Sequence, residues 1–108
     1  MISGGDNDLA ACACEIGLGV GLIASLKLTH LIPRERLTED YLARLVEGIY
    51  FSAVVLARLR NSVTDLASYA VRWHEPLRAM LASGQHRKIQ IACLRGRRRG
   101  LQFVESLE

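Results

Sequence analysis

The side chains best suited to chemistry lie in the first third of the chain: Asp6, Asp8, His30, Arg34 and Arg36. A carboxylate can accept the proton of a hydroxyl that lies within hydrogen-bond reach. A neutral imidazole can ligate a divalent cation or donate to a phosphate oxygen. Guanidinium groups pair with phosphates and carboxylates. These residue types therefore suit a ligand that carries a hydroxyl or a negative charge.

Each of these residues also has a purely structural interpretation. Acidic side chains are common at helix starts, and Asp6 and Asp8 stand at such a start. A lone histidine at a strand end is usually structural, and no second ligand stands at a useful spacing from His30, so we predict no metal site in this chain. Arg34 and Arg36 flank a glutamate and can form local salt bridges. The residues alone leave both interpretations open.

The elements expected around these residues are one helix and two short strands. A helix is predicted over Asp8–Ile16, and it ends at Gly17 because glycine takes the left-handed conformation without penalty. Short strands are predicted at Val20–Ile23 and Leu26–His30, where side chains alternate between two faces. Pro33 then ends any strand ladder, since it has no N–H to donate.

A long amphipathic helix should follow these strands. Thr38 is its predicted N-cap, acidic residues fill the first turn, and the helix extends to about Arg60. Asn61 or Ser62 then restarts a second helix. Apolar residues at helical spacing form one face of the long helix: Leu42, Leu45, Val46, Ile49 and Ala53.

The remaining C-terminal part is also predicted to be helical. Pro76 must kink or divide the second helix, because proline cannot continue the hydrogen-bond ladder. Ser83-Gly84 is the clearest late turn. A last basic helix begins near Gln85, and we expect it to be interrupted or frayed near Gly96 and Gly100.

Composition agrees with one small, mainly α-helical unit. The chain has 108 residues, of which 50% are apolar and 23% charged, as in ordinary globular proteins. Only 6% are aromatic, so aliphatic side chains must fill the core, which favours helices packed on helices. We predict a helical bundle with a short N-terminal β element.

Charge and cysteine content bear on partners and location. The net charge is +3, and much of the positive charge gathers near the C-terminus, where phosphate or an anionic membrane surface could bind unless the cluster is simply a solvated helix face. The chain has three cysteines without disulfide-framework spacing, and it shows no signal-peptide pattern. We therefore predict a cytoplasmic location, with peripheral contact to a membrane as an option. The clustered residues are Arg87, Lys88, Arg95, Arg97, Arg98 and Arg99.

Two stretches carry a family resemblance: the turn Gly4-Gly5-Asp6 followed by Asp8-Leu9, and the run HLIPRERLT over residues 30–38. From Ser3 to about Ser52 the chain resembles the C-terminal half of the catalytic domain of bacterial family-2 glycosyltransferases, inverting enzymes of the GT-A type. The resemblance implies a fragment of a GT-A-like α/β domain. Residues 1–33 would be its acceptor-side remnant, and residues 34–108 a C-terminal helical extension that packs on it.

The resemblance also implies roles for individual residues. In that family the aspartate of a Gly-Glu-Asp-type turn is the general base that takes the proton of the acceptor hydroxyl. This role falls on Asp6, with Asp8 as a weaker candidate, although a glycine rather than an acidic residue precedes Asp6. His30, Arg34 and Arg36 would lie on the substrate-binding side, the histidine toward the metal-diphosphate and the arginines toward an anionic acceptor.

The family's donor-binding half, with an aspartate-rich motif for Mg²⁺ or Mn²⁺, precedes the part that this chain resembles. We therefore expect the full-length parent to use a nucleotide-sugar, an acceptor hydroxyl and a divalent cation. The 108-residue chain should hold no cofactor and should transfer no sugar alone, because catalysis needs both substrates in one site. Met1 directly before a mid-domain motif predicts a truncated reading frame or an excised segment.

Two other classes of function stay open. A helical interaction module without catalysis would associate with itself through strand edges and apolar helix faces, and so predicts a homo-oligomer. Binding of nucleic acid or an anionic membrane surface through the basic C-terminal cluster predicts interactions that weaken as salt is added.

Overall fold

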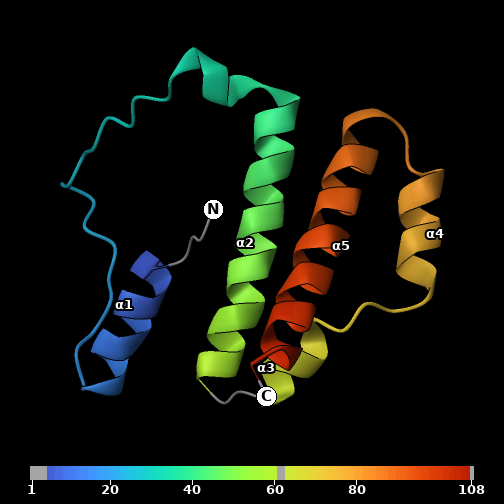
Figure 1. Cartoon of the computed structure of the whole chain (residues 1–108). Coiled ribbons are helices and arrows are strands. Elements are labelled where there is room, and N and C mark those ends of the chain that lie inside the picture. Colours follow the sequence, from blue (N-terminus) through green and yellow to red (C-terminus); the bar gives the residue numbers. More distant parts are fainter. Residues whose placement is uncertain (1–4, 61–62, 108) are drawn as a thin grey trace.

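The structure is a computed structural model that describes residues 5–60 and 63–107 (Figure 1). It confirms the mainly α fold class, since the described residues form helices. The helix starts predicted at Asn61 or Ser62 lie outside the described residues, as do residues 1–4, which include Gly4 of the family-like turn. In chain order the elements are α1 Gly5–Glu15, the short 3-10 helix η1 Arg34–Leu37, α2 Glu39–Leu59, α3 Val63–Ser68, α4 His74–Leu81 and α5 Gly84–Glu105.

Helix α2 forms where the long amphipathic helix is predicted. The Thr38 hydroxyl oxygen accepts a hydrogen bond from the Tyr41 amide at 3.2 Å, which satisfies one of the free N–H groups at the helix start. Glu39 and Asp40 follow in the first turn, where their negative charge is favourable to the helix dipole. Local sequence signals therefore fix the start of this helix.

Helix α5 is continuous, so the interruption predicted near Gly96 and Gly100 is wrong. Both glycines are buried against α2, which lies beside α5 and runs in the same direction (Figure 1). A Cβ on Gly96 would clash with the carbonyl oxygen of Glu47, and one on Gly100 would lie 2.7 Å from the Cβ of Val54. Close packing therefore outweighs the poor helix propensity of glycine, which costs about 1 kcal/mol relative to alanine.

Small side chains make up the core between α2 and α5. Among the described residues, Val54 is the largest side chain that is fully buried. Most protein cores are filled by large interlocking side chains. Here the two helix backbones pack closely together instead. The buried positions are Ser52, Val54 and Ala57 on α2 and Ala92, Gly96, Gly100 and Val104 on α5.

Helices α3 and α4 return the chain from the end of α2 to the start of α5. Pro76 lies in the first turn of α4, where its missing N–H would have no helical partner, and the helical stretch is divided as predicted. The predicted turn before α5 is also present. Gly84 has a φ of 56°, in the left-handed region that favours glycine.

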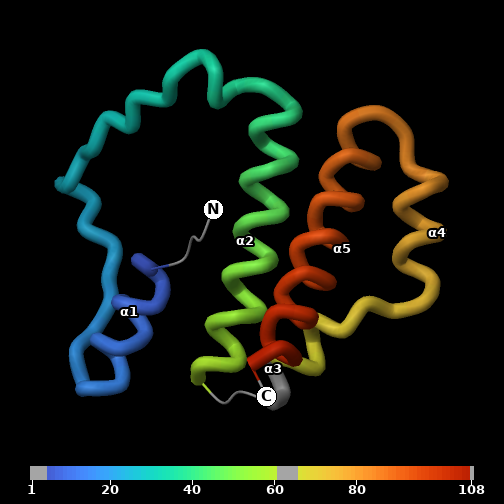
Figure 2. The backbone as a smooth tube through the Cα atoms, viewed as in Figure 1, coloured from blue at the N-terminus to red at the C-terminus, as the bar shows by residue number. Residues whose placement is uncertain are grey.

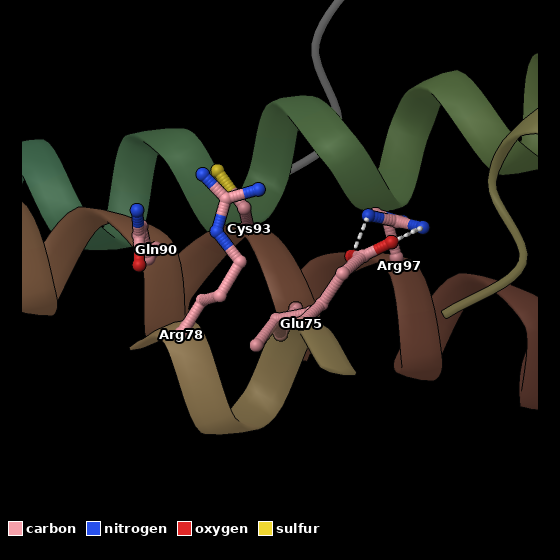
Figure 3. A pocket seen from close by; sticks show the side chains of 6 residues that line it. Glu75, Arg78, Gln90, Cys93 and Arg97 are labelled. Carbon is pink, nitrogen blue, oxygen red and sulfur yellow. Dashed lines mark hydrogen bonds and ion pairs between the residues drawn. The ribbon is translucent and has the colours of Figure 1, made fainter. Parts of the chain in front are cut away.

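Arg97 of α5 holds this return segment in place. Its Nε donates to the Tyr69 carbonyl at 2.8 Å, and its Nη2 donates to the Ala70 carbonyl. Its Nη1 pairs with the Glu75 carboxylate of α4 at 2.6 Å (Figure 3). One mostly buried guanidinium thus satisfies the carbonyls after α3 and also fixes α4.

The predicted strands Val20–Ile23 and Leu26–His30 are wrong. The described segment between α1 and η1 contains no strand, and the Leu26 amide donates to the Ile23 carbonyl at 3.0 Å in a turn. A strand needs a neighbour for its amide and carbonyl groups, and two short strands alone are marginally stable. The apolar side chains consequently face solvent, as shown by Leu28, which is 85% exposed.

The backbone traces an open arc on one side of a compact helix pair (Figure 2). Helix α1 lies beside α2, and the segment after it rises on the side of the molecule opposite α5 before the chain returns through η1. The radius of gyration is 16.4 Å. A compact domain of about this length has a radius of gyration of about 13 Å. The N-terminal arc therefore makes the chain more extended than a compact domain.

We expect Gly96→Ala and Gly100→Ala each to lower the free energy of unfolding by about 1–3 kcal/mol, because the added methyl group forces α2 and α5 apart. Urea denaturation followed by circular dichroism measures this change. Gly19→Ala is the matched control, since a Cβ there meets nothing within 4 Å. Native-like stability of Gly96→Ala would contradict the close packing.

Candidate functional site

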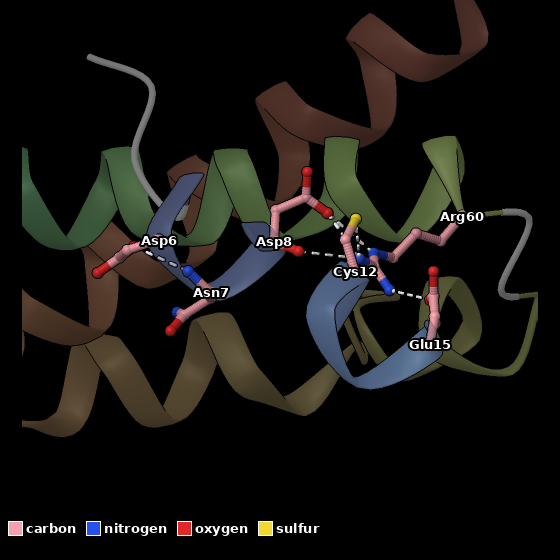
Figure 4. Close-up of polar contacts among 6 residues, drawn as sticks. All are labelled: Asp6, Asn7, Asp8, Cys12, Glu15 and Arg60. Atoms are coloured by element: carbon pink, nitrogen blue, oxygen red, sulfur yellow. Dashed lines mark hydrogen bonds and ion pairs between the residues drawn. The ribbon is translucent and has the colours of Figure 1, made fainter. Parts of the chain in front are cut away.

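Asp6, the predicted general base, lies in the first turn of α1 with its side chain in solvent. One carboxylate oxygen accepts a hydrogen bond from the Asn7 amide at 3.0 Å. Figure 4 shows the Asp6 side chain pointing away from the polar cluster that surrounds Arg60. Its carboxylate therefore stays accessible to a ligand.

Asp8 is instead engaged by Arg60 at the end of α2. Arg60 Nη2 and Nε donate to the same Asp8 carboxylate oxygen at 2.7 and 3.1 Å. Arg60 Nη1 donates to the Glu15 carboxylate at 2.7 Å, and Nη2 also lies 3.4 Å from the Cys12 sulfur (Figure 4). The hydrogen bond to Asp8 is the main cause that raises the pKa of Arg60. Asp8 thus has a structural role here, since this cluster attaches α1 to α2.

The structure leaves His30, Arg34 and Arg36 exposed. His30 lies in the extended segment, and no hydrogen bond or ion pair between described residues joins it to Asp6. Arg34 and Arg36 are on η1, and the Arg36 guanidinium carbon lies 5.9 Å from the centre of the Tyr41 ring. The predicted substrate-binding residues are therefore close together in the sequence, but their side chains do not form one contact cluster.

Asp6 borders a groove between α1 and α2. Its volume is about 330 Å³, and Leu45, Ile49 and Leu56 supply its apolar wall. Leu45 and Ile49 belong to the apolar face predicted for α2, so part of that face looks toward α1. We call this the α1–α2 groove. It places one free carboxylate at the edge of an apolar surface.

A second groove, of about 580 Å³, lies between α2 and α5 and was not predicted. Its wall includes Tyr41, Arg44 and Phe51 from α2 together with Arg99 from α5. The sequence gives a partial signal, because Arg44 and Phe51 are seven residues apart and so share one helix face. Arg99 could not be placed there without the register of the two helices.

A third and smaller cavity, of about 220 Å³, lies between α4 and α5 beside the Arg97–Glu75 pair (Figure 3). Cys93 lines it, and burial raises the pKa of the Cys93 thiol. The pKa of Tyr50 is also raised, mainly by the charge of the neighbouring Cys93 and by a hydrogen bond with it. A thiol that resists ionisation is a poor nucleophile, so this cavity has the character of a structural site.

Half of the basic C-terminal cluster forms ion pairs within the chain. Lys88 pairs with Glu39 at 2.8 Å, Arg97 with Glu75, and Arg99 with Glu47. Each pair ties α5 to α2 or α4. The positive charge near the C-terminus is thus partly used to hold the bundle together, and Arg87, Arg95 and Arg98 remain as exposed cations of α5.

The divalent cation implied by the family resemblance does not fit the residues present. Across residues 5–60 and 63–107, no three histidine, cysteine or acidic side chains gather in a group that could hold a metal ion. His30 is exposed, and it belongs to no such group among the described residues. No chemical step is therefore derived through a metal in this chain.

Comparisons of the chain with protein-family models, curated proteins and solved structures find no match. The glycosyltransferase resemblance therefore stays a prediction. Within the described part of the chain, no helix is both long enough and apolar enough to cross a membrane.

We expect Arg60→Gln to release α1 from α2, because the ion pairs with Asp8 and Glu15 centre on this guanidinium. Hydrogen exchange of the α1 amides should accelerate, while the amides of α2 and α5 keep their protection. Arg98→Gln is the control, since it removes the same charge from an exposed position on α5. Unchanged exchange in α1 would show that other contacts hold this helix.

Burial alone would raise the pKa of Glu75, but the hydrogen bonds from Arg97 and from the Arg72 amide outweigh it and lower that pKa. A lowered folded-state pKa means that the pair stabilises the fold above the carboxyl's unfolded pKa and loses this effect as the pH falls through the folded pKa.

Glu75→Gln should therefore lower the free energy of unfolding by about 1–2 kcal/mol at neutral pH, and the difference from the native chain should shrink in acid. Urea denaturation at several pH values measures this. Glu105→Gln, an exposed carboxylate change on α5, should leave stability nearly unchanged at every pH. A loss that is equal at neutral and acidic pH would contradict the ionic origin of the effect.

Proposed function

We propose that this chain is the acceptor-side, C-terminal part of a family-2 glycosyltransferase. In this proposal it contributes the general base and part of the acceptor surface, and a donor-binding half outside the 108 residues binds the nucleotide-sugar. The chain alone is inactive. The proposal rests on the motif resemblance over residues 3–52 together with one feature of the fold.

The feature that carries the proposal is the exposed apolar segment between α1 and η1. Its sequence alternates like a buried strand, yet it has no strand partner among the described residues. Large apolar side chains exposed in a row indicate a surface that another element covers. A donor-binding sheet would supply the missing neighbour strand. The exposed side chains are Leu18, Val20, Leu22, Ile23, Leu26, Leu28, Leu31 and Ile32.

The geometry favours Asp6 over Asp8 as the base. Asp8 is held in an ion pair with Arg60, so proton transfer through it would disturb the attachment of α1. Asp6 is accessible, lies at the edge of the α1–α2 groove, and has one carboxylate oxygen that accepts from the Asn7 amide. A carboxylate in this position can take the proton of an acceptor hydroxyl while the hydroxyl oxygen attacks the anomeric carbon of the sugar.

His30, Arg34 and Arg36 keep their proposed substrate-side roles as exposed groups next to the apolar segment. Ordering of that segment against a donor-binding sheet would fix the position of His30, which now has solvent around it. Both substrates must meet in one site for transfer to occur, and the chain alone offers only the acceptor side. Inactivity of the isolated chain follows from this.

Self-association is a second candidate function, and the same exposed apolar segment favours it. Two copies could cover each other's segment and form a homo-oligomer without any catalysis. Binding of nucleic acid or an anionic membrane through the exposed cations Arg87, Arg95 and Arg98 is a weaker alternative, because the rest of the basic cluster is paired within the chain. Analytical sedimentation separates self-association from the first proposal, which expects a monomer that needs a different partner.

The decisive test joins this chain to the polypeptide encoded in frame upstream of Met1. We expect that upstream DNA to encode alternating strands and helices with an Asp-x-Asp motif, and the joined protein to transfer sugar from a nucleotide-sugar. Asp6→Asn should lower the transfer rate by about 10²–10⁴-fold. Asp40→Asn, an exposed acidic residue at the start of α2, should leave the rate unchanged.

The isolated chain should bind no nucleoside diphosphate in calorimetry with Mg²⁺ or Mn²⁺ present. Tight metal-dependent binding by the chain alone would contradict its inactivity. An upstream sequence without the expected motif, or full activity of Asp6→Asn in the joined protein, would contradict the proposed function itself.

A further inference from the structure

The groove between α2 and α5 combines free positive charge with aromatic surface in an arrangement that the proposed function does not use. We call it the aromatic–arginine groove, and define it by Tyr41, Arg44, Leu45, Glu47, Phe51 and Arg99. Its volume of about 580 Å³ is in the range of small-molecule sites. The distribution of charge along it indicates what kind of molecule it accepts.

The two ends of this groove differ. Tyr41 and Phe51 are ten residues apart on one helix, which places them about 15 Å apart along the helix axis. At the Tyr41 end lie two guanidinium groups: Arg44 in the wall, and Arg36 of η1, whose Cζ is 5.9 Å from the Tyr41 ring centre. Neither arginine has an ion-pair partner among the described residues. These two guanidinium groups are therefore available to pair with an anion at neutral pH.

The Phe51 end is electrically balanced and apolar. Arg99 lies over the Phe51 ring at 5.9 Å and is neutralised by its ion pair with Glu47. Phe51 also packs against Phe103, with ring centres 5.7 Å apart, so its position is fixed. Leu45 and the side-chain-free Gly48 lie between the two ends, which leaves room along the groove.

We propose that the aromatic–arginine groove binds a phosphate monoester that carries an alkyl or aryl group. The phosphate sits between Arg36 and Arg44, and the apolar group extends past Leu45 toward Phe51. A phosphate monoester has a charge of about −1.5 to −2 at neutral pH, which matches the two free guanidinium groups, and arginine binds phosphate oxygens through paired hydrogen bonds. A carboxylate, with one negative charge, would leave one of the two arginines uncompensated.

The proposal goes beyond the glycosyltransferase assignment and does not depend on it. The α1–α2 groove holds Asp6, whereas the aromatic–arginine groove is built from α2 and α5, with Arg36 of η1 beside its Tyr41 end. Binding can therefore be measured on the 108-residue chain alone, with no sugar donor present. Failure of the sugar-transfer tests leaves this inference standing, and the reverse is also true.

The test uses dodecyl phosphate, kept below its micelle-forming concentration, and isothermal calorimetry on the whole chain. We expect saturable one-to-one binding. Arg44→Gln should weaken it by about tenfold, the size of effect expected when one charge-assisted hydrogen-bonding partner is lost, and Arg36→Gln/Arg44→Gln should weaken it further. Both arginines are exposed, so circular dichroism should show an unchanged fold. Arg87→Gln, which removes one charge from the exposed part of α5, should bind within about twofold of the native chain.

Three further ligands separate the possible sources of binding. Inorganic phosphate tests the charge alone, dodecyl maltoside tests the apolar chain alone, and vesicles of anionic phospholipid test a lipid surface. The proposal expects each to bind at least tenfold more weakly than dodecyl phosphate. Equal binding of inorganic phosphate or dodecyl maltoside would overturn it. An equal loss in Arg87→Gln, or binding to vesicles only, would also overturn it and would point to diffuse attraction by the basic helix.

Discussion

The contact between α2 and α5 is the constraint on which the rest of the structure depends. Gly96 and Gly100 allow the two backbones to approach so closely that a single methyl group would not fit. Because the described core contains no fully buried side chain larger than valine, this contact has to stabilise the bundle through the fit of two helix surfaces. The register of the two helices also decides which side chains meet. It brings Arg99 over Phe51 and beside Glu47, and so forms one wall of the aromatic–arginine groove.

Two arginines attach the other elements to this helix pair, and they do so with different strength. Arg97 is mostly buried, with 14% of its side chain exposed, and it binds two backbone carbonyls as well as Glu75. Arg60 is more exposed, and α1 has no buried residue of its own. Ion pairs in contact with solvent contribute little and are screened by salt. The α3–α4 return is therefore a firm part of the bundle, whereas the position of α1, and with it Asp6, depends on a weaker attachment.

Sequence alone predicts the elements whose signals are local. The Thr38 cap, the division at Pro76 and the turn at Ser83-Gly84 were all predicted, because each depends on the chemistry of a few adjacent residues. The continuity of α5 was missed, since a glycine that weakens an isolated helix can be required by a neighbouring helix. The Arg60–Asp8 pair joins residues 52 positions apart, so no local pattern could show that Asp8 is occupied. Asp6 was identified by a motif, and its accessibility became evident only from the fold.

The missing strands follow from the same distinction between local and distant causes. Alternating side chains between α1 and η1 predict strands, but a strand exists only when another strand satisfies its backbone groups. The described chain offers none, so the pattern is present without the structure it predicts. A purely local preference for irregular backbone would have favoured polar residues, because exposed apolar side chains gain nothing in a loop. Leu22, Leu26 and Leu28 are exposed in this segment, and the proposed donor-binding half would be the element that covers them.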